Sequence, residues 1–389
     1  MTRSDPVHDP YADHASAHAG GPVRRVPQGA GGRCSYLVTG YAAARAALAD
    51  ARLSKDTAAF FAAHPSGRDL HPALSRTMLA TDPPGHTRLR ALVAKAFTTA
   101  AATRLRPRVQ EITDELLDRL PGGGRADLVA GLAEPLPVAV ICELLGVPPA
   151  DRVRVRHWSA ELFAAGRPAA VDAASHAVAS YMAELIAARR AGPGDRLLDG
   201  LIAARDGDDR LSEDELVSLA CLLLVAGHET TTNFIGNALL ALLLHPAAGE
   251  RLLAEPDAVP GALDELLRFD PPVATATFRH STGPLTLAGA EIPAGVPVLV
   301  ALGAANRDPE RFAAPHALDL DRQDASAHLA FGHGIHRCVG AQLARTEAGI
   351  ALRSILARFP GIRLAVPPQE LRRRPTRLVR GLVALPVQL

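Results

Sequence analysis

The long apolar segment between Ser212 and Leu244 constrains the fold of this chain more than any other feature. Ser212 followed by Glu215 is a capping-box pattern, which predicts the start of a helix, and His245 with Pro246 predicts its end. Roughly 32 residues at about 1.5 Å per residue make a helix about 48 Å long. A helix of that length crosses the whole domain that contains it.

The middle of this segment carries the polar sequence AGHETT, residues 226–231, between apolar runs. A glycine inside a helix costs about 1 kcal/mol relative to alanine, and a buried glutamate is costly unless it is hydrogen-bonded. Two such penalties in an otherwise favourable helix predict a functional site. They also argue against a membrane span, because a charge at a bilayer centre costs about 2.5–3.5 kcal/mol or more. Since the N-terminus shows no apolar signal-peptide core, we expect a soluble, cytoplasmic protein.

The rest of the chain predicts one mainly α domain, residues 33–389, with a small β region and a loosely ordered N-terminal segment, residues 1–32. Helical patterns cover residues 41–50, 86–97, 103–120, 135–148, 257–269 and 339–359, with further helical segments over 151–205. Strand patterns cover residues 34–40 and 378–387 and short runs between 273 and 303. The formal net charge of +1 gives no field that would attract nucleic acid or an anionic membrane.

Four cysteines are too few and too far apart in the sequence for a disulfide scaffold or a paired metal motif. Cys142 and Cys221 lie in apolar helical runs, which predicts small buried side chains. Cys338 differs, because it lies in the glycine-rich stretch FGHGIHRCVG just before a predicted helix. Backbone N–H groups and the helix dipole there favour a thiolate. The residues alone leave three alternatives: a nucleophile, a metal or haem ligand, or a buried thiol.

The spacing within FGHGIHRCVG resembles the haem-binding motif of the cytochrome P450 superfamily: Phe, two residues, Gly, three residues, Cys, one residue, Gly. This resemblance implies the P450 fold with one haem-binding domain and Cys338 as the axial ligand of the iron. A thiolate ligand directs electron density toward bound oxygen and favours O–O cleavage. Phe331 would pack beside the sulfur, Gly332 would keep the loop close to the porphyrin, and His336 would bind a haem propionate.

The segment AGHETT resembles the oxygen-activation motif of the same family. By this resemblance Thr230 would hydrogen-bond the oxygen being activated, and Glu229 would relay protons to it. Ala226 and Gly227 would leave room for oxygen and substrate.

Two cations on one helix face form a second constellation. His86 and Arg90, four residues apart, would repel each other unless an anion lies between them, and haem has two propionates. Arg279 resembles a further propionate-binding arginine of the family.

The sequence also contains Glu265 and Arg268, three residues apart and therefore on one helix face. They resemble the Glu-x-x-Arg pair that stabilises the family fold behind the haem loop. The resemblance gives Arg311, in PERF, as the third partner of this structural pair.

The resemblance is closest to soluble bacterial members and implies a haem-thiolate monooxygenase. Such an enzyme binds haem b and inserts one atom of O2 into a medium or large hydrophobic molecule, such as a polyketide, macrolide, terpenoid or steroid of secondary metabolism. No flavin or dinucleotide motif is visible, so NAD(P)H would act indirectly, through a ferredoxin and its reductase, on a monomeric enzyme. Family analogy places these residues in the substrate pocket: Phe60, Phe61, Phe163 and Val273. It suggests these docking charges: Arg88, Arg337 and Arg345.

Two rival functions remain open at this stage. A haem enzyme could instead catalyse oxidative coupling, ring closure or peroxide-driven oxidation, although Glu229 with Thr230 argues against pure peroxide use. A hydrolase without haem could use Cys338 as its nucleophile and His333 or His336 as its base. That second function leaves the cation pair on residues 86–90 unexplained.

Overall fold

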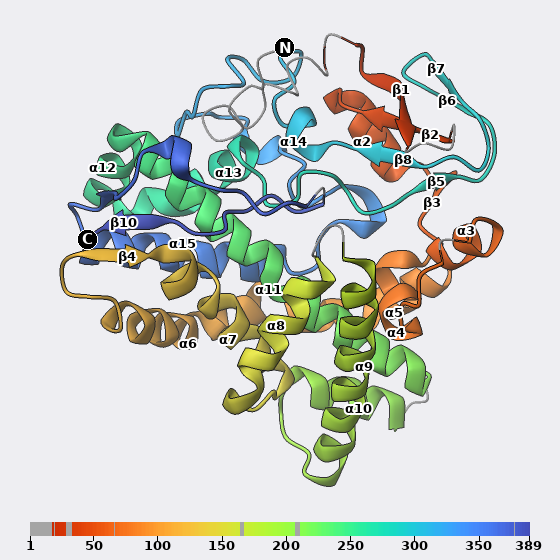
Figure 1. Cartoon of the computed structure of the whole chain (residues 1–389), viewed down its shortest axis with the longest axis horizontal. Helices are drawn as coiled ribbons and strands as arrows, with labels where there is room; N and C mark the ends of the chain where they lie inside the picture. Colours follow the sequence, from red (N-terminus) through yellow and green to blue (C-terminus); the bar gives the residue numbers. More distant parts are fainter. Residues whose placement is uncertain are drawn as a thin grey trace.

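Helix α11, Glu213–Leu244, crosses the centre of the molecule and is buried along most of its length (Figure 1). The computed structural model describes residues 18, 20–28, 33–65, 67–163, 167–206, 211–376 and 378–389. The predicted capping box is confirmed, since the Ser212 hydroxyl accepts from the Glu215 N–H and the Glu215 carboxylate accepts from the Ser212 N–H, at 3.1 and 2.9 Å. Helices α4, α7, α9 and α15 contact α11.

The other helices form a block around α11, and the helical patterns found in the sequence are confirmed within a few residues. Their bounds are α2 Tyr41–Ala49, α3 Thr57–Ala63, α4 Pro72–Ser75, α5 Gly85–Ala94, α6 Thr99–Asp118, α7 Pro135–Leu145, α8 Arg152–Leu162, α9 Pro168–Ala191, α10 Leu197–Asp206, α12 Pro246–Ala254, α13 Val259–Phe269, α14 Leu302–Ala305 and α15 Ala341–Arg358.

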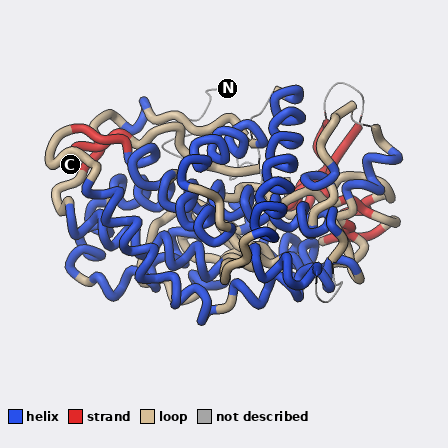
Figure 2. Tube along the Cα trace, turned by 90° about the horizontal axis from the view of Figure 1, so that it is seen from below, coloured by secondary structure: helices blue, strands red, loops and turns tan. Residues whose placement is uncertain are grey.

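Small sheets lie at two opposite ends of this block (Figure 2). One end holds a sheet of order β1-β2-β8, in which β1 and β2 are antiparallel and β8 is parallel to β2, together with the pairs β3-β5 and β6-β7. The other end holds the sheet β4-β10-β9. The bounds are β1 Val23–Gln28, β2 Arg33–Val38, β3 Leu53–Ser54, β4 Arg125–Asp127, β5 His280–Ser281, β6 Leu285–Leu287, β7 Ala290–Ile292, β8 Val298–Val300, β9 Arg363–Leu364 and β10 Pro386–Gln388.

Two sequence predictions about the ends of the chain need correction. Strand β1 lies inside the segment expected to be loosely ordered, because its backbone pairs with β2 from Val23 opposite Val38 to Gln28 opposite Arg33. Residues 1–17, 19 and 29–32 of that segment lie outside the described residues. In the C-terminal stretch predicted as strand, only its last part belongs to β10, and the earlier part forms isolated bridges.

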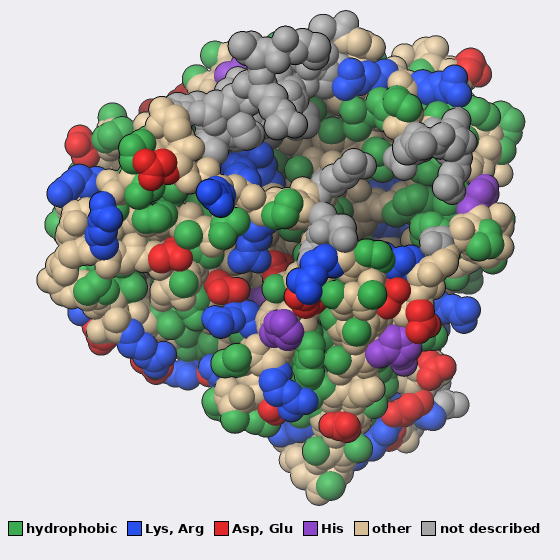
Figure 3. All heavy atoms as spheres, viewed as in Figure 1, with side chains coloured by type: hydrophobic (Ala, Val, Ile, Leu, Met, Phe, Trp, Pro, Cys, Tyr) green, Lys and Arg blue, Asp and Glu red, His purple; other side chains and the backbone are tan. Residues whose placement is uncertain are grey.

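Burial agrees with the remaining predictions for the helices. Cys142 and Cys221 are fully buried, as expected of small side chains in apolar helical runs. Within the described part of the chain, no helix combines the length and the apolar character that a bilayer span requires. The face shown in Figure 3 mixes acidic and basic side chains over α9 and α10, in line with the small net charge.

Candidate active site

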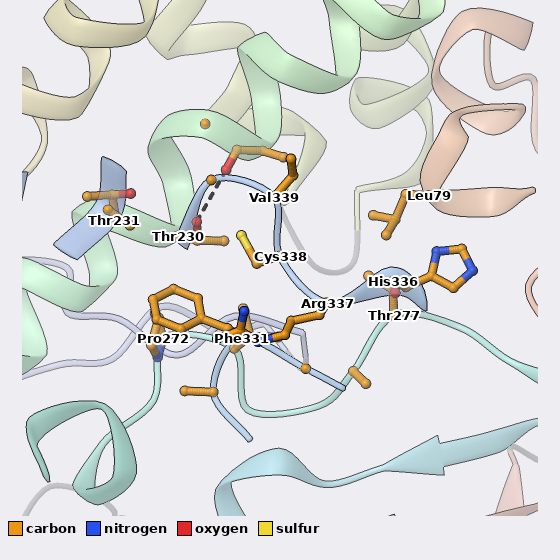
Figure 4. Close-up of a pocket in the computed structure, with 18 of the residues that line it drawn as sticks. Leu79, Thr230, Thr231, Pro272, Thr277, Phe331, His336, Arg337, Cys338 and Val339 are labelled. Atoms are coloured by element: carbon orange, nitrogen blue, oxygen red, sulfur yellow. Dashed lines mark hydrogen bonds between the residues drawn. The ribbon is translucent and has the colours of Figure 1, made fainter. Parts of the chain in front are cut away.

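A largely apolar cavity lies between α11 and the loop that precedes α15 (Figure 4). Its walls come from α5, α7, α11, residues 267–279 and residues 330–347, which are far apart in the sequence. The structure brings together in this lining most of the predicted site residues: His86, Arg90, Ala226, Gly227, Thr230, Val273, Arg279, Phe331, Gly332, His336 and Cys338. In Figure 4 the side chain of Cys338 points into the same space as Thr230 of α11.

The loop before α15 depends on two glycines with left-handed backbone angles. Gly332 and Gly334 have φ of 72° and 73°, which side chains with a Cβ rarely adopt. A Cβ at Gly334 would also lie 2.8 Å from the carbonyl oxygen of Leu48. The turn is closed by a hydrogen bond of 2.8 Å from the Cys338 N–H to the Phe331 carbonyl. This backbone geometry fixes the direction of the Cys338 side chain.

The electrostatics of Cys338 differ from the sequence prediction. Burial by the surrounding protein raises the pKa of the thiol, while the Gly340 N–H, Arg90 and Arg337 lower it by less. The exposed surface of Cys338 faces the cavity rather than bulk solvent. Loss of hydration therefore outweighs the helix terminus. A thiolate at this position needs a further positive charge at the sulfur, which a bound metal ion would supply.

Basic side chains gather at one side of the cavity. The rings of His86 and His336 lie 4.1 Å apart, and among the described residues neither His86 nitrogen has a hydrogen-bond partner, nor does His336 Nε2. Burial lowers the pKa of His336 to about 2, helped by the charges of Lys55, His86, Arg279 and Arg90. Burial also lowers the pKa of Arg279 to about 10. These groups are arranged for a ligand that brings negative charge.

Lys55 belongs to the same basic cluster and was not predicted. It lies at the end of β3, is 2% exposed, and its Nζ donates to the Thr277 hydroxyl. Burial and the charge of Arg279 lower its pKa well below the usual range. The sequence hints at Lys55 only through its residue type, because Lys55 and Lys95 are the only lysines in the sequence. Burial of a residue beside a two-residue strand depends on distant packing and not on its neighbours in the sequence.

The residues of this cavity fit a haem group. Asp82 is the carboxylate that acts on Lys55, His86 and Arg279, and it already accepts from the Ser54 hydroxyl and the Lys55 N–H. Among the described residues this one acid does not provide enough acceptors for all of these basic side chains, whereas the two carboxylates of a haem group would satisfy the orphaned nitrogens of His86 and His336. The apolar walls would suit the porphyrin, and the Cys338 thiol, which points into the cavity, would be the ligand that the protein offers to the iron.

Four residues in the middle of α11 were predicted to belong to the site, and three of them line the cavity. The Thr230 hydroxyl donates to the Ala226 carbonyl at 3.2 Å, and both residues line the cavity with Gly227. A Cβ on Gly227 would lie 2.8 Å from Ile141, so this glycine also permits the close packing of α7. Glu229 is not among the described lining residues; it is buried behind the wall, with Oε2 3.5 Å from Arg374 Nη1.

The buried ion pair of Glu265 and Arg268 is confirmed, but its third partner is not Arg311. Both oxygens of Glu265 accept from Arg268, at 2.7 and 2.8 Å, and Glu265 Oε2 accepts from Arg322 Nε at 3.1 Å. Arg311 instead pairs with Asp324 at 2.5 Å, where both side chains are partly exposed. Both arginines lie in the irregular region 304–330, where no periodic pattern shows which one turns inward.

Three predicted pocket residues lie outside the described lining, and only Val273 belongs to it. Phe60 stacks on His64, with ring centroids 4.5 Å apart, and Phe61 is 42% exposed. Phe163 is half-buried at the end of α8. The sequence analysis missed Glu347, a buried acid that does line the cavity and whose pKa is raised to about 8 by burial.

The three arginines suggested as docking charges differ in how far they are exposed and paired with acids. Arg88 pairs with Glu215, and Arg345 pairs with Asp264 and is only 21% exposed. Arg337 is exposed, and its carbonyl accepts from Arg90 Nη2 at 2.6 Å.

The geometry argues against the hydrolase alternative. His333 Nε2 accepts from Arg45 at 3.3 Å, and a histidine with the low pKa of His336 is a weak general base.

Comparison with known proteins shows what the whole chain is similar to. The cytochrome P450 family model matches residues 169–386. Cytochrome P450 107B1 of Saccharopolyspora erythraea is 47% identical over 94% of this chain and 92% of its own length. The cytochrome P450 monooxygenase PikC of Streptomyces venezuelae is 46% identical over 98% of this chain and 91% of its own length. The solved structure of the tirandamycin C-bound P450 monooxygenase TamI is 46% identical, with a TM-score of 0.92 over 100% of this chain and 99% of that one.

Proposed function

Because this chain belongs to the cytochrome P450 family of haem enzymes that use O2, we propose that Cys338 is the axial ligand of a haem iron bound in the cavity described above. One observation carries the proposal: a thiol, two histidines whose ring nitrogens have no partner among the described residues, two arginines and the polar centre of α11 line a single apolar cavity. Bound haem b supplies the reductive activation of O2. The enzyme is a monooxygenase that places one oxygen atom on a hydrophobic substrate.

Four basic residues hold the carboxylates of the haem in this proposal. His86 and His336 donate from nitrogens that have no partner in the described protein, and Arg90 and Arg279 add charge-assisted hydrogen bonds. Lys55 adds a further cation from the end of β3. Phe331 and Gly332 let the loop approach the porphyrin closely.

Thr230 and Glu229 handle the protons that oxygen activation consumes. The Thr230 hydroxyl lines the cavity and here donates to the Ala226 carbonyl; turned into the cavity, it would hold and pass on a proton at its Oγ1. Glu229, one residue earlier on α11, donates a proton through that hydroxyl. Burial raises the pKa of Glu229, more than Arg374 lowers it, which keeps a larger share of this acid protonated near neutral pH.

The substrate is a medium or large hydrophobic molecule, such as a macrolide, polyketide, terpenoid or steroid. Much of the cavity wall is apolar, with Leu79, Leu222, Val273 and Ala276 among its residues. Relatives of this chain include a mycinamicin IV hydroxylase/epoxidase, a 6-deoxyerythronolide B hydroxylase and a vitamin D(3) 25-hydroxylase. Electrons come from NAD(P)H through a ferredoxin and its reductase, and the enzyme works as a cytoplasmic monomer.

The spectrum of the purified protein tests this proposal. Reduced protein with carbon monoxide should show the strongly red-shifted Soret band of a thiolate-ligated haem. Difference spectra with a panel of macrolides, terpenoids and steroids should then identify ligands by their shift of the oxidised band. A colourless protein that does not take up added haemin would refute the proposal.

Replacing Thr230 by alanine should separate electron use from product formation. We expect NADPH and O2 consumption to continue while product formation falls by about 100-fold, because a positioned proton transfer contributes at least that much. Product, NADPH and hydrogen peroxide should be measured together with a substrate found in the spectral panel. Thr230→Ser keeps the hydroxyl and is the matched control. Equal coupling in Thr230→Ala and wild type would contradict the role of Thr230.

A further inference from the structure

A row of alternating acidic and basic side chains, here called the file, leads from the buried Glu229 of α11 to the surface. Arg374 Nη1 lies 3.5 Å from Glu229 Oε2, and Arg374 Nη2 lies 3.9 Å from Glu134 Oε1. Glu134 Oε2 in turn lies 3.6 Å from Arg156 Nη1. The exposed fraction of the side chains is 4% for Glu229, 22% for Arg374, 18% for Glu134 and 44% for Arg156. The file therefore connects a buried carboxyl to solvent.

Arg374 is held so that its two terminal nitrogens face two different acids. Its backbone N–H donates to the Gly381 carbonyl at 2.9 Å, and its Nε donates to the Leu382 carbonyl at 3.3 Å. Among the described residues Glu229 Oε2 has no hydrogen-bond partner, so Arg374 acts on it by charge alone. The neighbouring Arg373, by contrast, is hydrogen-bonded to Asn237 and Asp270 at 3.0 and 2.8 Å.

We propose that Arg374 is a positioning residue shared between Glu229 and Glu134, and that Glu134, by competing for this cation, sets how readily Glu229 holds and releases its proton. The inference depends on the relay role proposed above for Glu229. In each relay step Glu229 loses one proton toward Thr230. One proton from solvent then restores it. Arg374 keeps its own protons throughout, and it favours whichever carboxylate is ionised at the time.

The other described titratable residues near Glu229 have less influence on its ionisation than Arg374. His228 precedes Glu229 on α11 and is fully buried, its Nδ1 lies 2.8 Å from the Leu224 carbonyl, and burial lowers its pKa to about 4. It is therefore neutral at physiological pH. Arg156, on α8, contacts Glu134 and not Glu229. Among the described residues, Arg374 is the charge that lowers the pKa of Glu229 against the effect of burial.

Two substitutions should move the ionisation of Glu229 in opposite directions. Arg374→Gln removes the cation, so the pKa of Glu229 should rise by about one pH unit or more. Glu134→Gln removes the competing carboxylate, so Arg374 should act on Glu229 alone and the pKa of Glu229 should fall. Arg374→Lys keeps the charge and should restore the wild-type value. The pH at which coupled turnover declines should move in the same direction as the pKa, because the protonated acid is the donor.

The measurement is an infrared titration of the haem-loaded protein. Protonated carboxyl bands are compared between each variant and the same variant carrying Glu229→Gln, so that the bands of all other carboxyl groups, including the buried Glu347, cancel. The reduced carbon monoxide spectrum checks the haem site independently. A normal spectrum with an unmoved Glu229 band in both Arg374→Gln and Glu134→Gln overturns this inference and leaves the proposed function intact. If Arg374→Gln does not fold, Glu134→Gln decides alone, since its side chain is partly exposed: a fall supports the inference and no change refutes it.

Discussion

Cys338→Ser protein will lose the red-shifted Soret band of the reduced carbon monoxide complex, and its monooxygenase activity will fall below detection. A serine hydroxyl has a far higher pKa than a thiol, so it does not provide a stable anionic ligand at neutral pH. The electron donation that favours O–O cleavage is lost with the sulfur. A coloured protein with a changed spectrum is the expected product of this substitution.

The reason that colour should persist lies in the rest of the site. The turn that carries residue 338 depends on Gly332, Gly334 and the backbone bond to Phe331, none of which involves the sulfur. The basic cluster around His86 and Arg279 lies on other elements and still offers its nitrogens to the carboxylates of the haem. Haem should therefore bind more weakly but in the same cavity.

A second cysteine provides the matched control. Cys34 lies in β2, is not among the described residues that line the cavity, and should tolerate Cys34→Ser with an unchanged spectrum. The two variants should be compared in the reduced carbon monoxide spectrum and in turnover with the same electron donors. A thiolate spectrum in Cys338→Ser would show that another residue ligates the iron.

The parts of this structure that could be predicted from the sequence depend on local patterns. The capping box and the apolar run lie within α11 itself, so they predict this helix from one segment. The glycines before Cys338 predict a turn from a stretch of ten residues. The charge state of Cys338 could not be predicted in this way. The helix terminus is visible in the sequence and favours a thiolate, but the packing that removes water from the sulfur comes from distant segments and has the larger effect.

The missed site residues have the same physical origin. Lys55 and Glu347 are unremarkable in their local sequence, and tertiary packing buries both of them. Glu347 lines the cavity, and Lys55 bonds to Thr277, which lines it. Strand β1 was missed because its pairing with β2, and not a hydrophobic pattern, defines it. Arg311 was preferred to Arg322 on a motif alone, and only the path of the chain between 304 and 330 decides which arginine reaches Glu265.

Arg268→Ala should destabilise the folded protein by about 3–5 kcal/mol, because it leaves the carboxylate of Glu265 buried with one cation fewer. Arg268 is 0% exposed, and it also donates to the carbonyls of Asn306 and Pro315 at 3.0 and 2.8 Å. These bonds tie α13 to the irregular region that leads into the Cys338 loop. Since proteins are typically stable by only about 5–15 kcal/mol, the loss should lower the yield of haem-loaded protein strongly.

Arg311→Ala and Arg322→Ala separate the observed ion-pair network from the one predicted by family resemblance. Arg322 is 6% exposed and bonds to Glu265, so Arg322→Ala should shift the urea midpoint in the same direction as Arg268→Ala. The pair of Arg311 with Asp324 is partly exposed, so Arg311→Ala should change stability by about 1 kcal/mol or less. Urea midpoints followed by fluorescence and by the haem spectrum measure these changes. Removing a cation costs more when the carboxylate that loses it is buried, as Glu265 is. A larger shift for Arg311→Ala than for Arg322→Ala would therefore contradict this network and would mean that Arg311 stabilises the fold behind the cavity.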